Sequence, residues 1–194
     1  MLRAVPRRAH GAALALATCL LPGAVWSPAG PLLPATALEL GGSTQFVQAP
    51  WKVDLVCWFT EVGFPSPDYF FTLTLPAGAS AGLGRLTITQ TRGVDRQFGF
   101  HLGASRAFVG RPRREGRPVP VVVTFDPDTR QFSIDIPEPV PPDTTLTVVL
   151  RPWRNPMQAD TYMFQVTAYP AGPQPVARPV GFATLRIDQP GWRP

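Results

Sequence analysis

Hydrophobic and polar residues alternate along most of the chain that follows residue 45. In the segment 69–75, Tyr69, Phe71, Leu73 and Leu75 share one face, and Phe70, Thr72 and Thr74 share the other. The same alternation recurs in Val119–Phe125, Phe132–Ile136, Leu146–Leu150 and Tyr162–Ala168. Successive side chains of a β-strand point to opposite faces, so this period of two predicts strands in all five segments.

Weaker alternation predicts further strands. These lie at 85–91, 97–102 and 181–187, with a short edge at Phe46–Val47. Prolines stand at or near the strand ends, where they permit a sheet but block helical continuation. The pattern predicts one all-β domain of about eight to ten strands, a two-layer β-sandwich of general immunoglobulin-like architecture with one apolar face per strand. A closed barrel is the alternative, because alternation alone does not distinguish the two.

Proline and aspartate also predict the connections. Asp126-Pro-Asp-Thr129 is typical of a hairpin turn between two alternating runs, and Pro141-Pro-Asp-Thr144 is typical of a second turn. The segments 103–118 and 152–160 show no alternation and are expected to be long irregular loops. Loops of that length are more common where they carry a function.

The N-terminal residues have the layout of an export signal. Arg3, Arg7 and Arg8 precede an apolar run over 11–21 that Pro22 ends. This run is far shorter than the ~20 apolar residues that span a bilayer, so it predicts a cleavable signal helix and no anchor. Ala35-Thr-Ala37 is the preferred cleavage site and Ser27-Pro-Ala29 the rival. We therefore expect a signal peptide and processing region at 1–37 and a single β-sandwich domain at 38–194.

Export changes how composition and cysteine content are interpreted. The chain has 18 basic and 13 acidic residues, and removal of 37 residues with three arginines leaves 15 minus 13, a net charge of +2. The remaining cysteine, Cys57, has no intramolecular partner and alternates in phase with Val53, Leu55 and Phe59, so we expect a buried, inert thiol. We expect the protein in the periplasm, the outer envelope or the medium, with no transmembrane segment in the mature chain.

Six short motifs resemble a known family. They are Phe46-Val-x-Ala-Pro50, Tyr69-Phe-Phe-Thr-Leu-Thr-Leu-Pro76, Ala107-Phe-Val-Gly110, Val140-Pro-Pro-x-Thr-Thr145, Arg151-Pro-x-Arg-Asn-Pro156 and Tyr162-x-Phe-x-Val-Thr-Ala-x-Pro-Ala-Gly172. In this order they resemble the exported cyanobacterial proteins catalogued as domain of unknown function 2808. The resemblance implies export, a mostly β domain and a cyanobacterial origin, and it implies no activity. Asp143 and Gln158-Ala-Asp160 stand where the family pattern has more glycine.

The residues after the leader offer little for catalysis or metal binding. His101 is the one histidine and is expected to face solvent; a triad of His101 with Ser105 and Asp95 lacks a nucleophile-elbow sequence. Asp126 and Asp128 fit a turn better than a calcium site, because no run of alternating oxygen ligands follows. Glu61, Asp68 and Glu138 serve a glycosidase only if the fold brings two of them together. We expect no catalytic residue, no metal and no cofactor.

Arginine and tryptophan supply the binding candidates. Arg106, Arg111, Arg113, Arg114 and Arg117 fall within twelve residues and are offset only by Glu115. Guanidinium groups match carboxylate, sulfate and phosphate, so the segment could bind an anionic polysaccharide or lipid head groups, while a solvated loop is the simpler interpretation. Trp51, Trp58 and Trp153 could stack on sugars, but packing in the core or in loops is favoured.

These features favour a non-catalytic binding module of the cell envelope. Its partner would be an envelope protein or an anionic envelope polymer. A structural or assembly protein of the envelope is the alternative, and an exported hydrolase is the third hypothesis. Nucleic acid is not expected as a partner, because an exported protein rarely meets it.

Overall fold

The computed structural model describes residues 38–40 and 42–191, and the expected leader with its cleavage site lies outside the described residues. The described residues form strands and two short 3₁₀ helices, η1 (Ala77–Ala79) and η2 (Leu102–Ala104). The strands are β1 (Leu38–Leu40), β2 (Ser43–Gln45), β3 (Val53–Val56), β4 (Tyr69–Leu75), β5 (Leu83–Arg92), β6 (Arg106–Arg111), β7 (Arg114–Val119), β8 (Val122–Asp126), β9 (Gln131–Val140), β10 (Thr144–Leu150), β11 (Asp160–Pro170) and β12 (Arg178–Ile187).

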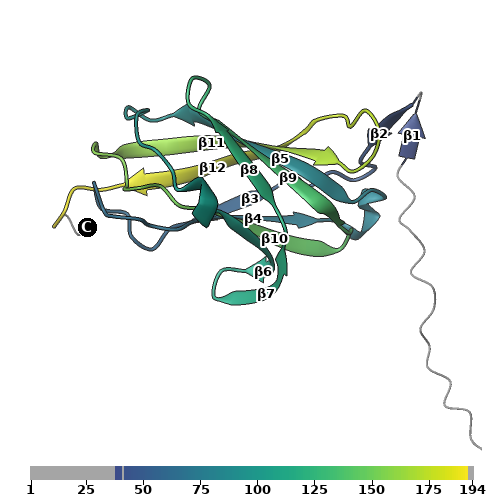
Figure 1. Cartoon of the computed structure of the whole chain (residues 1–194), viewed down its shortest axis with the longest axis horizontal. Coiled ribbons are helices and arrows are strands. Elements are labelled where there is room, and N and C mark those ends of the chain that lie inside the picture. The colour runs from purple at the N-terminus through teal and green to yellow at the C-terminus, as the bar shows by residue number, and fades with distance from the viewer. Residues whose placement is uncertain (1–37, 41, 192–194) are drawn as a thin grey trace, which may run out of the picture. The chain divides into compact units, whose positions relative to one another are not determined.

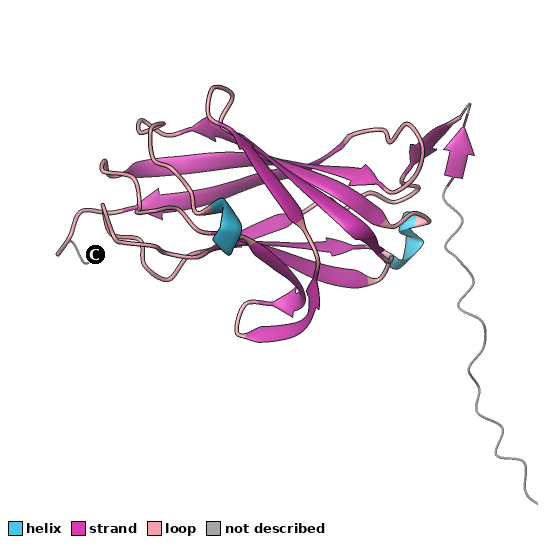
Figure 2. Cartoon of the chain, viewed as in Figure 1, coloured by secondary structure: helices cyan, strands magenta, loops and turns pink. Residues whose placement is uncertain are grey.

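Ten of these strands form two antiparallel sheets that pack face to face (Figures 1 and 2). The first, here the β4 sheet, has the order β3-β4-β10-β6-β7. The second, here the β11 sheet, has the order β12-β11-β5-β9-β8, and β1 pairs with β2 separately. The two sheets are separate, so the all-β sandwich is confirmed and the barrel is not formed.

The core lies between the sheets and follows the predicted alternation. On β11, Tyr162, Phe164, Val166 and Ala168 are each at most 1% exposed. Phe71 and Leu73 of β4 face them from the other sheet, and the Phe71 and Phe164 rings meet edge to face at 5.6 Å. Burial of such side chains contributes about 25 cal/mol per Å² of apolar surface, which makes this packing the main source of stability, since the described residues contain no disulfide.

The expectation of one apolar face per strand is wrong for β4 and β10. Phe70 and Val149 point out of the sandwich, yet they are 3% and 0% exposed. They form a second cluster with Phe108 of β6 and the half-buried Val56 of β3. Other side chains therefore cover part of the outer face of the β4 sheet, among them Trp58 and Arg106, which pack on the Phe70 ring.

The most important correction to the predicted strands concerns β6 and β7. Residues 103–118 are not a long loop, because β6 and β7 form a hairpin whose turn is Pro112-Arg113. The turn has proline first and a residue with positive φ second, since Arg113 has φ 66°, as in a type II turn. All of β7 except Val119 is exposed, so no hydrophobic alternation was available to predict it.

Three smaller differences concern strand boundaries. The segment 97–102 is not a strand; only Phe100 forms an isolated bridge, to Pro152. The edge strand predicted at Phe46–Val47 lies at Ser43–Gln45 instead. The predicted run 119–125 is divided between β7 and β8, which belong to different sheets.

Candidate functional site

A bend in the β6–β7 hairpin builds the candidate site. The pairing of β6 with β7 shifts register between Phe108 and Gly110, and such a bulge bends a hairpin. Gly110 has φ 113°, and a Cβ there would lie 2.5 Å from the carbonyl oxygen of Arg114. Glycine is therefore required at this position, and the bend carries the hairpin turn over the outer face of the β4 sheet.

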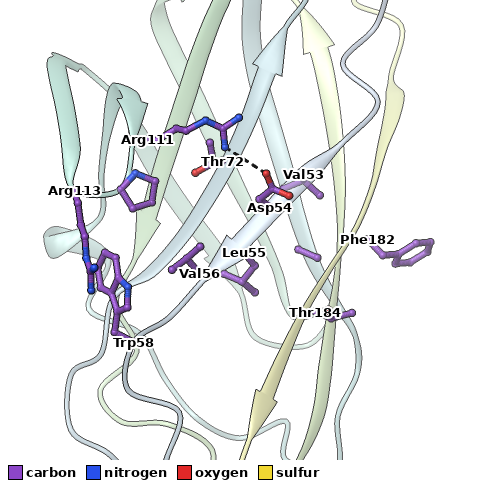
Figure 3. Close-up of a pocket in the computed structure, with 12 residues that line it drawn as sticks. Val53, Asp54, Leu55, Val56, Trp58, Thr72, Arg111, Arg113, Phe182 and Thr184 are labelled. Carbon is purple, nitrogen blue, oxygen red and sulfur yellow. Dashed lines mark ion pairs between the residues drawn. The ribbon is translucent and has the colours of Figure 1, made fainter.

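Two arginine contacts show how far the hairpin reaches. Nη1 of Arg111 lies 3.5 Å from Oδ2 of Asp54 on β3, although β10 and β4 lie between β6 and β3 in the sheet (Figure 3). The guanidinium carbon of Arg113 lies 4.6 Å from the centre of the Trp58 ring. Trp58 in turn packs on Phe70 at 4.7 Å, so the hairpin, the indole and the outer cluster form one continuous assembly.

An open groove of about 570 Å³ lies beneath this hairpin (Figure 3). Its wall on one side is Arg111, Pro112, Arg113 and Trp58, and its floor is β3 with Thr72. Residues 182–184 of β12 complete the lining from the other sheet. A second depression of about 420 Å³ shares Asp54, Thr72 and Arg111 with the first and extends the polar surface to Trp51 and Lys52.

A threonine ladder crosses the same face. The hydroxyls of Thr72 and Thr147 are 2.9 Å apart, and those of Thr74 and Thr145 are 3.0 Å apart. The Thr147 hydroxyl also donates to the Gly110 carbonyl at 2.7 Å, which holds the bend in place. Thr74 is exposed, so part of the ladder is available to a ligand's hydroxyl groups.

The five arginines proposed from the sequence do not act as one flexible cluster. Arg106 is engaged, with Nη1 3.5 Å from Asp68 and Nη2 3.1 Å from Glu115. Arg111 and Arg113 lie at the groove, as described above. Arg114 and Arg117 are exposed on β7, at the edge of the sheet. The hairpin therefore divides the set into one structural arginine, two groove arginines and two edge arginines.

The three described tryptophans are exposed, contrary to the packing that sequence reasoning favoured. The exposed fractions are 78% for Trp51, 42% for Trp58 and 58% for Trp153. Trp51 and Trp58 line the two neighbouring depressions, while Trp153 lies elsewhere, among residues 96–102. Their position beside prolines and out of phase with the core was the sequence signal for exposure.

Cys57 is half-buried, and Phe59, predicted to share its core face, is 52% exposed. The thiol packs against the core and donates to the Phe59 carbonyl at 3.1 Å. Burial raises the pKa of the thiol from 9.0 to about 11, against the smaller opposing effect of that hydrogen bond. The thiol is protonated at neutral pH, so it is a poor nucleophile.

In the part of the chain that the structure describes, His101 does not form the catalytic triad considered from the sequence. His101 is exposed, as predicted, and its ring packs edge to face on Trp153 at 6.1 Å. Among the described residues, no hydrogen bond links it to Ser105 or Asp95, and no group of three histidine, cysteine or acidic side chains could hold a metal ion. Asp126 accepts from the backbone of Asp128 and the hydroxyl of Thr129, and these hydrogen bonds lower the pKa of Asp126. It closes the β8–β9 turn, as predicted.

Comparison with known proteins identifies a family match and several distant structures. Residues 43–187 match the model of a family described as "Protein of unknown function (DUF2808)". No curated protein matches the sequence. Among the described residues, no helix has the length and apolar character needed to cross a membrane.

Three solved structures have low sequence identity to this chain and TM-scores under 0.5. A DUF4466 family protein from Parabacteroides merdae has 10% identity and a TM-score of 0.44 over 74% of this chain and 46% of its own. BcpA, the major pilin subunit of Bacillus cereus, has 8% identity and a TM-score of 0.47 over 73% and 41%. An uncharacterized protein from Nocardia farcinica with an immunoglobulin-like fold has 15% identity and a TM-score of 0.42 over 71% and 98%. The chain thus spans less than half of the first two structures, and at these values the similarity says nothing about ligands.

Proposed function

The chain belongs to the family described as "Protein of unknown function (DUF2808)", and on that premise we propose that it is a non-catalytic module of the cell envelope that binds an anionic polysaccharide on the outer face of the β4 sheet. The proposal includes export to the periplasm, the outer envelope or the medium. It also includes a cyanobacterial source. The layout of residues 1–37 and the six family motifs support these two parts.

The observation that carries the proposal is the combination of exposed indoles and arginines on one face. Trp58 and Trp51 offer flat apolar rings, which stack on the faces of sugar rings. Arg111 and Arg113 stand over the same surface, and a guanidinium pairs with a carboxylate or sulfate through two parallel hydrogen bonds. An acidic sugar presents both features that this surface complements.

The two groove arginines remain available to a ligand. The side chains of Arg111 and Asp54 are 60% and 38% exposed, and an exposed ion pair contributes only about 0–1 kcal/mol. A ligand's acid group can therefore replace Asp54 at little cost. Among the described residues Arg113 has no carboxylate within ion-pair distance, and its contact with Trp58 fixes the guanidinium beside the indole. Arg114 and Arg117 extend the positive charge along β7, whereas Arg106 is committed to Asp68 and Glu115.

The test compares two variants of equal charge. We expect Arg111→Gln/Arg113→Gln to bind polygalacturonate at least about tenfold more weakly than the parent, because it removes both guanidiniums from the groove. The control Arg85→Gln/Arg178→Gln removes two exposed arginines outside the groove and should change affinity less than about twofold. Calorimetric titration measures both, with melting temperatures to confirm that all three proteins fold.

Two further measurements test the same proposal: the salt dependence of binding and the binding of a neutral polymer. Binding should weaken steeply between 0.1 and 1 M salt, since the Debye length falls from about 10 to 3 Å, and dextran should not bind. Equal losses in the two double variants would mean that only net charge matters. If the groove variant binds like the parent, the surface does not recognise acidic sugars and the assembly hypothesis takes first place.

A further inference from the structure

A different depression, away from the groove, surrounds a buried arginine. It has a volume of about 490 Å³, which is within the range of small-molecule sites. We call it the Arg130 pocket. Its principal lining residues are Arg96, Phe98, Phe100, Phe125, Arg130 and Trp153. It therefore combines a largely aromatic wall with two positive charges.

Arg130 is held in an unusual way for a buried cation. The residue is 4% exposed, and its guanidinium carbon lies 4.6 Å from the Phe98 ring, 4.9 Å from Phe125 and 5.7 Å from Phe100. Its Nε and Nη2 both donate to Oε1 of Gln90 at 3.1 Å, and its Nη1 donates to the Phe98 carbonyl at 2.9 Å. These partners are neutral, and among the described residues no carboxylate lies within ion-pair distance of Arg130.

This arrangement leaves part of the hydrogen-bonding capacity of Arg130 unused and gives its charge aromatic rings but no carboxylate as close partners in the described part of the chain. A guanidinium has five N–H groups, and three of those of Arg130 donate to protein oxygens in the described part of the chain. Burial, and then the charge of Arg96, lower the pKa of Arg130 to about 10, against the smaller opposing effect of the Asp95 carboxylate, which lies beyond ion-pair distance. The side chain is still charged at neutral pH, and a buried charge is costly unless it is paired. An anion in the pocket would supply the missing partner.

Trp153 provides a fixed flat wall beside the two arginines. Its backbone N–H donates to the Gly99 carbonyl at 3.0 Å, and its carbonyl accepts from the Ser66 N–H at 3.0 Å. The indole lies directly on Gly99, where a Cβ would come within 2.8 Å of the ring. The side chain is nevertheless 58% exposed, so one part of the indole is free to contact a ligand.

We propose that the Arg130 pocket binds a small aromatic carboxylate. The carboxylate pairs with the guanidiniums of Arg96 and Arg130, and the aromatic ring packs against Trp153 and the phenylalanines. This site is independent of the polysaccharide groove, because the two share no lining residue. Either proposal can fail without the other.

The first test uses 2-naphthoate and its neutral counterpart 2-naphthamide as probes. Ligand-observed NMR titration of the parent protein, up to about 5 mM, should show saturable binding of naphthoate and at least about tenfold weaker binding of the amide. Equal binding of the two probes, or no binding of naphthoate, overturns the proposal. A peptide ending in Phe with a free carboxylate that binds more than about tenfold tighter than naphthoate also overturns it, because the ligand would then be a chain terminus.

The second test uses exposed residues, whose substitution leaves the core intact. Arg96→Gln should weaken naphthoate binding at least about fivefold, and Trp153→Ala at least about tenfold. The matched controls are Arg92→Gln and Trp51→Ala, which remove an exposed arginine and an exposed indole elsewhere and should change it less than about twofold. If the pocket variants bind like these controls, Arg130 has a purely structural role and the proposal fails.

Discussion

At the scale of single residues, Asn155 holds the segment that carries Trp153. Its side chain is fully buried and makes three hydrogen bonds: it accepts from the Tyr69 hydroxyl at 2.7 Å and donates to the carbonyls of Phe59 and Glu61 at 2.8 Å each. Tyr69 begins a core strand, whereas residues 59 and 61 lie in the loop that follows β3. One amide therefore fastens two irregular segments to the sandwich.

Replacing Asn155 should lower the free energy of unfolding. Asn155→Leu has a similar volume but removes all three hydrogen bonds. The buried Tyr69 hydroxyl loses its partner Asn155, at a cost of about 1–3 kcal/mol. The Phe59 and Glu61 carbonyls keep the Cys57 thiol and the Phe64 N–H as donors, so each of these two lost bonds costs about 0.5–1.5 kcal/mol. We expect a loss of roughly 3 kcal/mol in the free energy of unfolding, measured by urea denaturation. Gln158→Ala, at an exposed position nearby, should change it by less than about 0.5 kcal/mol. A loss in Asn155→Leu no larger than in this control would show that the three hydrogen bonds do not anchor the segment.

The sequence indicated some residues of the candidate site and missed others. Arg111 and Arg113 were identified from charge density alone, which does not depend on fold. Asp54 and Thr72 could not be assigned to the site, because their contact with the hairpin depends on the bend at Gly110. Arg130 was missed because nothing in a turn sequence shows that three rings from other segments close around it.

At the scale of elements, prolines had less effect on strand length than expected. β4, β10 and β11 lie where alternation predicted them. However, β9 continues through Pro137 and Pro139, which we expected to end it. Its pairing with β5 jumps from Asp135 to Val140 opposite a single residue, Gly84, so the prolines occupy an irregular stretch where no ladder hydrogen bond is required.

The hairpin bend gives a prediction at the same scale. In Gly110→Ala the new Cβ would meet the Arg114 carbonyl oxygen at 2.5 Å and occupy a φ of 113°, so the bulge must rearrange. We expect a loss of about 2 kcal/mol or more in the free energy of unfolding, together with weaker polygalacturonate binding.

Gly103→Ala is the matched control for that experiment. A Cβ there would meet nothing within 4 Å, so stability should change by less than about 0.5 kcal/mol. Equal stability of the two variants would contradict the view that Gly110 sets the bend. If Gly110→Ala were destabilised but bound polygalacturonate normally, the bend would not position the groove arginines.

At the scale of the whole molecule, one half-buried thiol and two buried tyrosine hydroxyls make the fold sensitive to alkaline pH. Burial raises the pKa of Cys57 to about 11 and that of Tyr162 to about 12, and it raises the pKa of Tyr69 well above 10. Above pH 9 the unfolded chain releases protons that the folded state still holds. The folded state then binds more protons than the unfolded state, so stability falls as pH rises.

This sensitivity can be measured between pH 8 and pH 10. The free energy of unfolding of the parent should decrease across this range, and Cys57→Ser should make the decrease smaller, since Cys57 has the lowest unfolded pKa of the three. Higher pH is less informative, because Arg130, with its lowered pKa, acts in the opposite direction above pH 10. If the parent and Cys57→Ser gave identical pH profiles, folding would not raise the pKa of the Cys57 thiol.

The contact between Arg111 and Asp54 has a further consequence for the ligands that the groove can retain. Because the Asp54 carboxylate already pairs with Arg111, a single dissolved anion must displace it to bind there. The net gain in binding free energy is then only the difference between two similar ion pairs. A polymer that engages Arg113 or the edge arginines at the same time holds its next acid group at high effective concentration beside Arg111. The internal ion pair thus reduces what Arg111 adds to the binding of a monomeric sugar acid, and the face should favour long chains that engage several arginines at once.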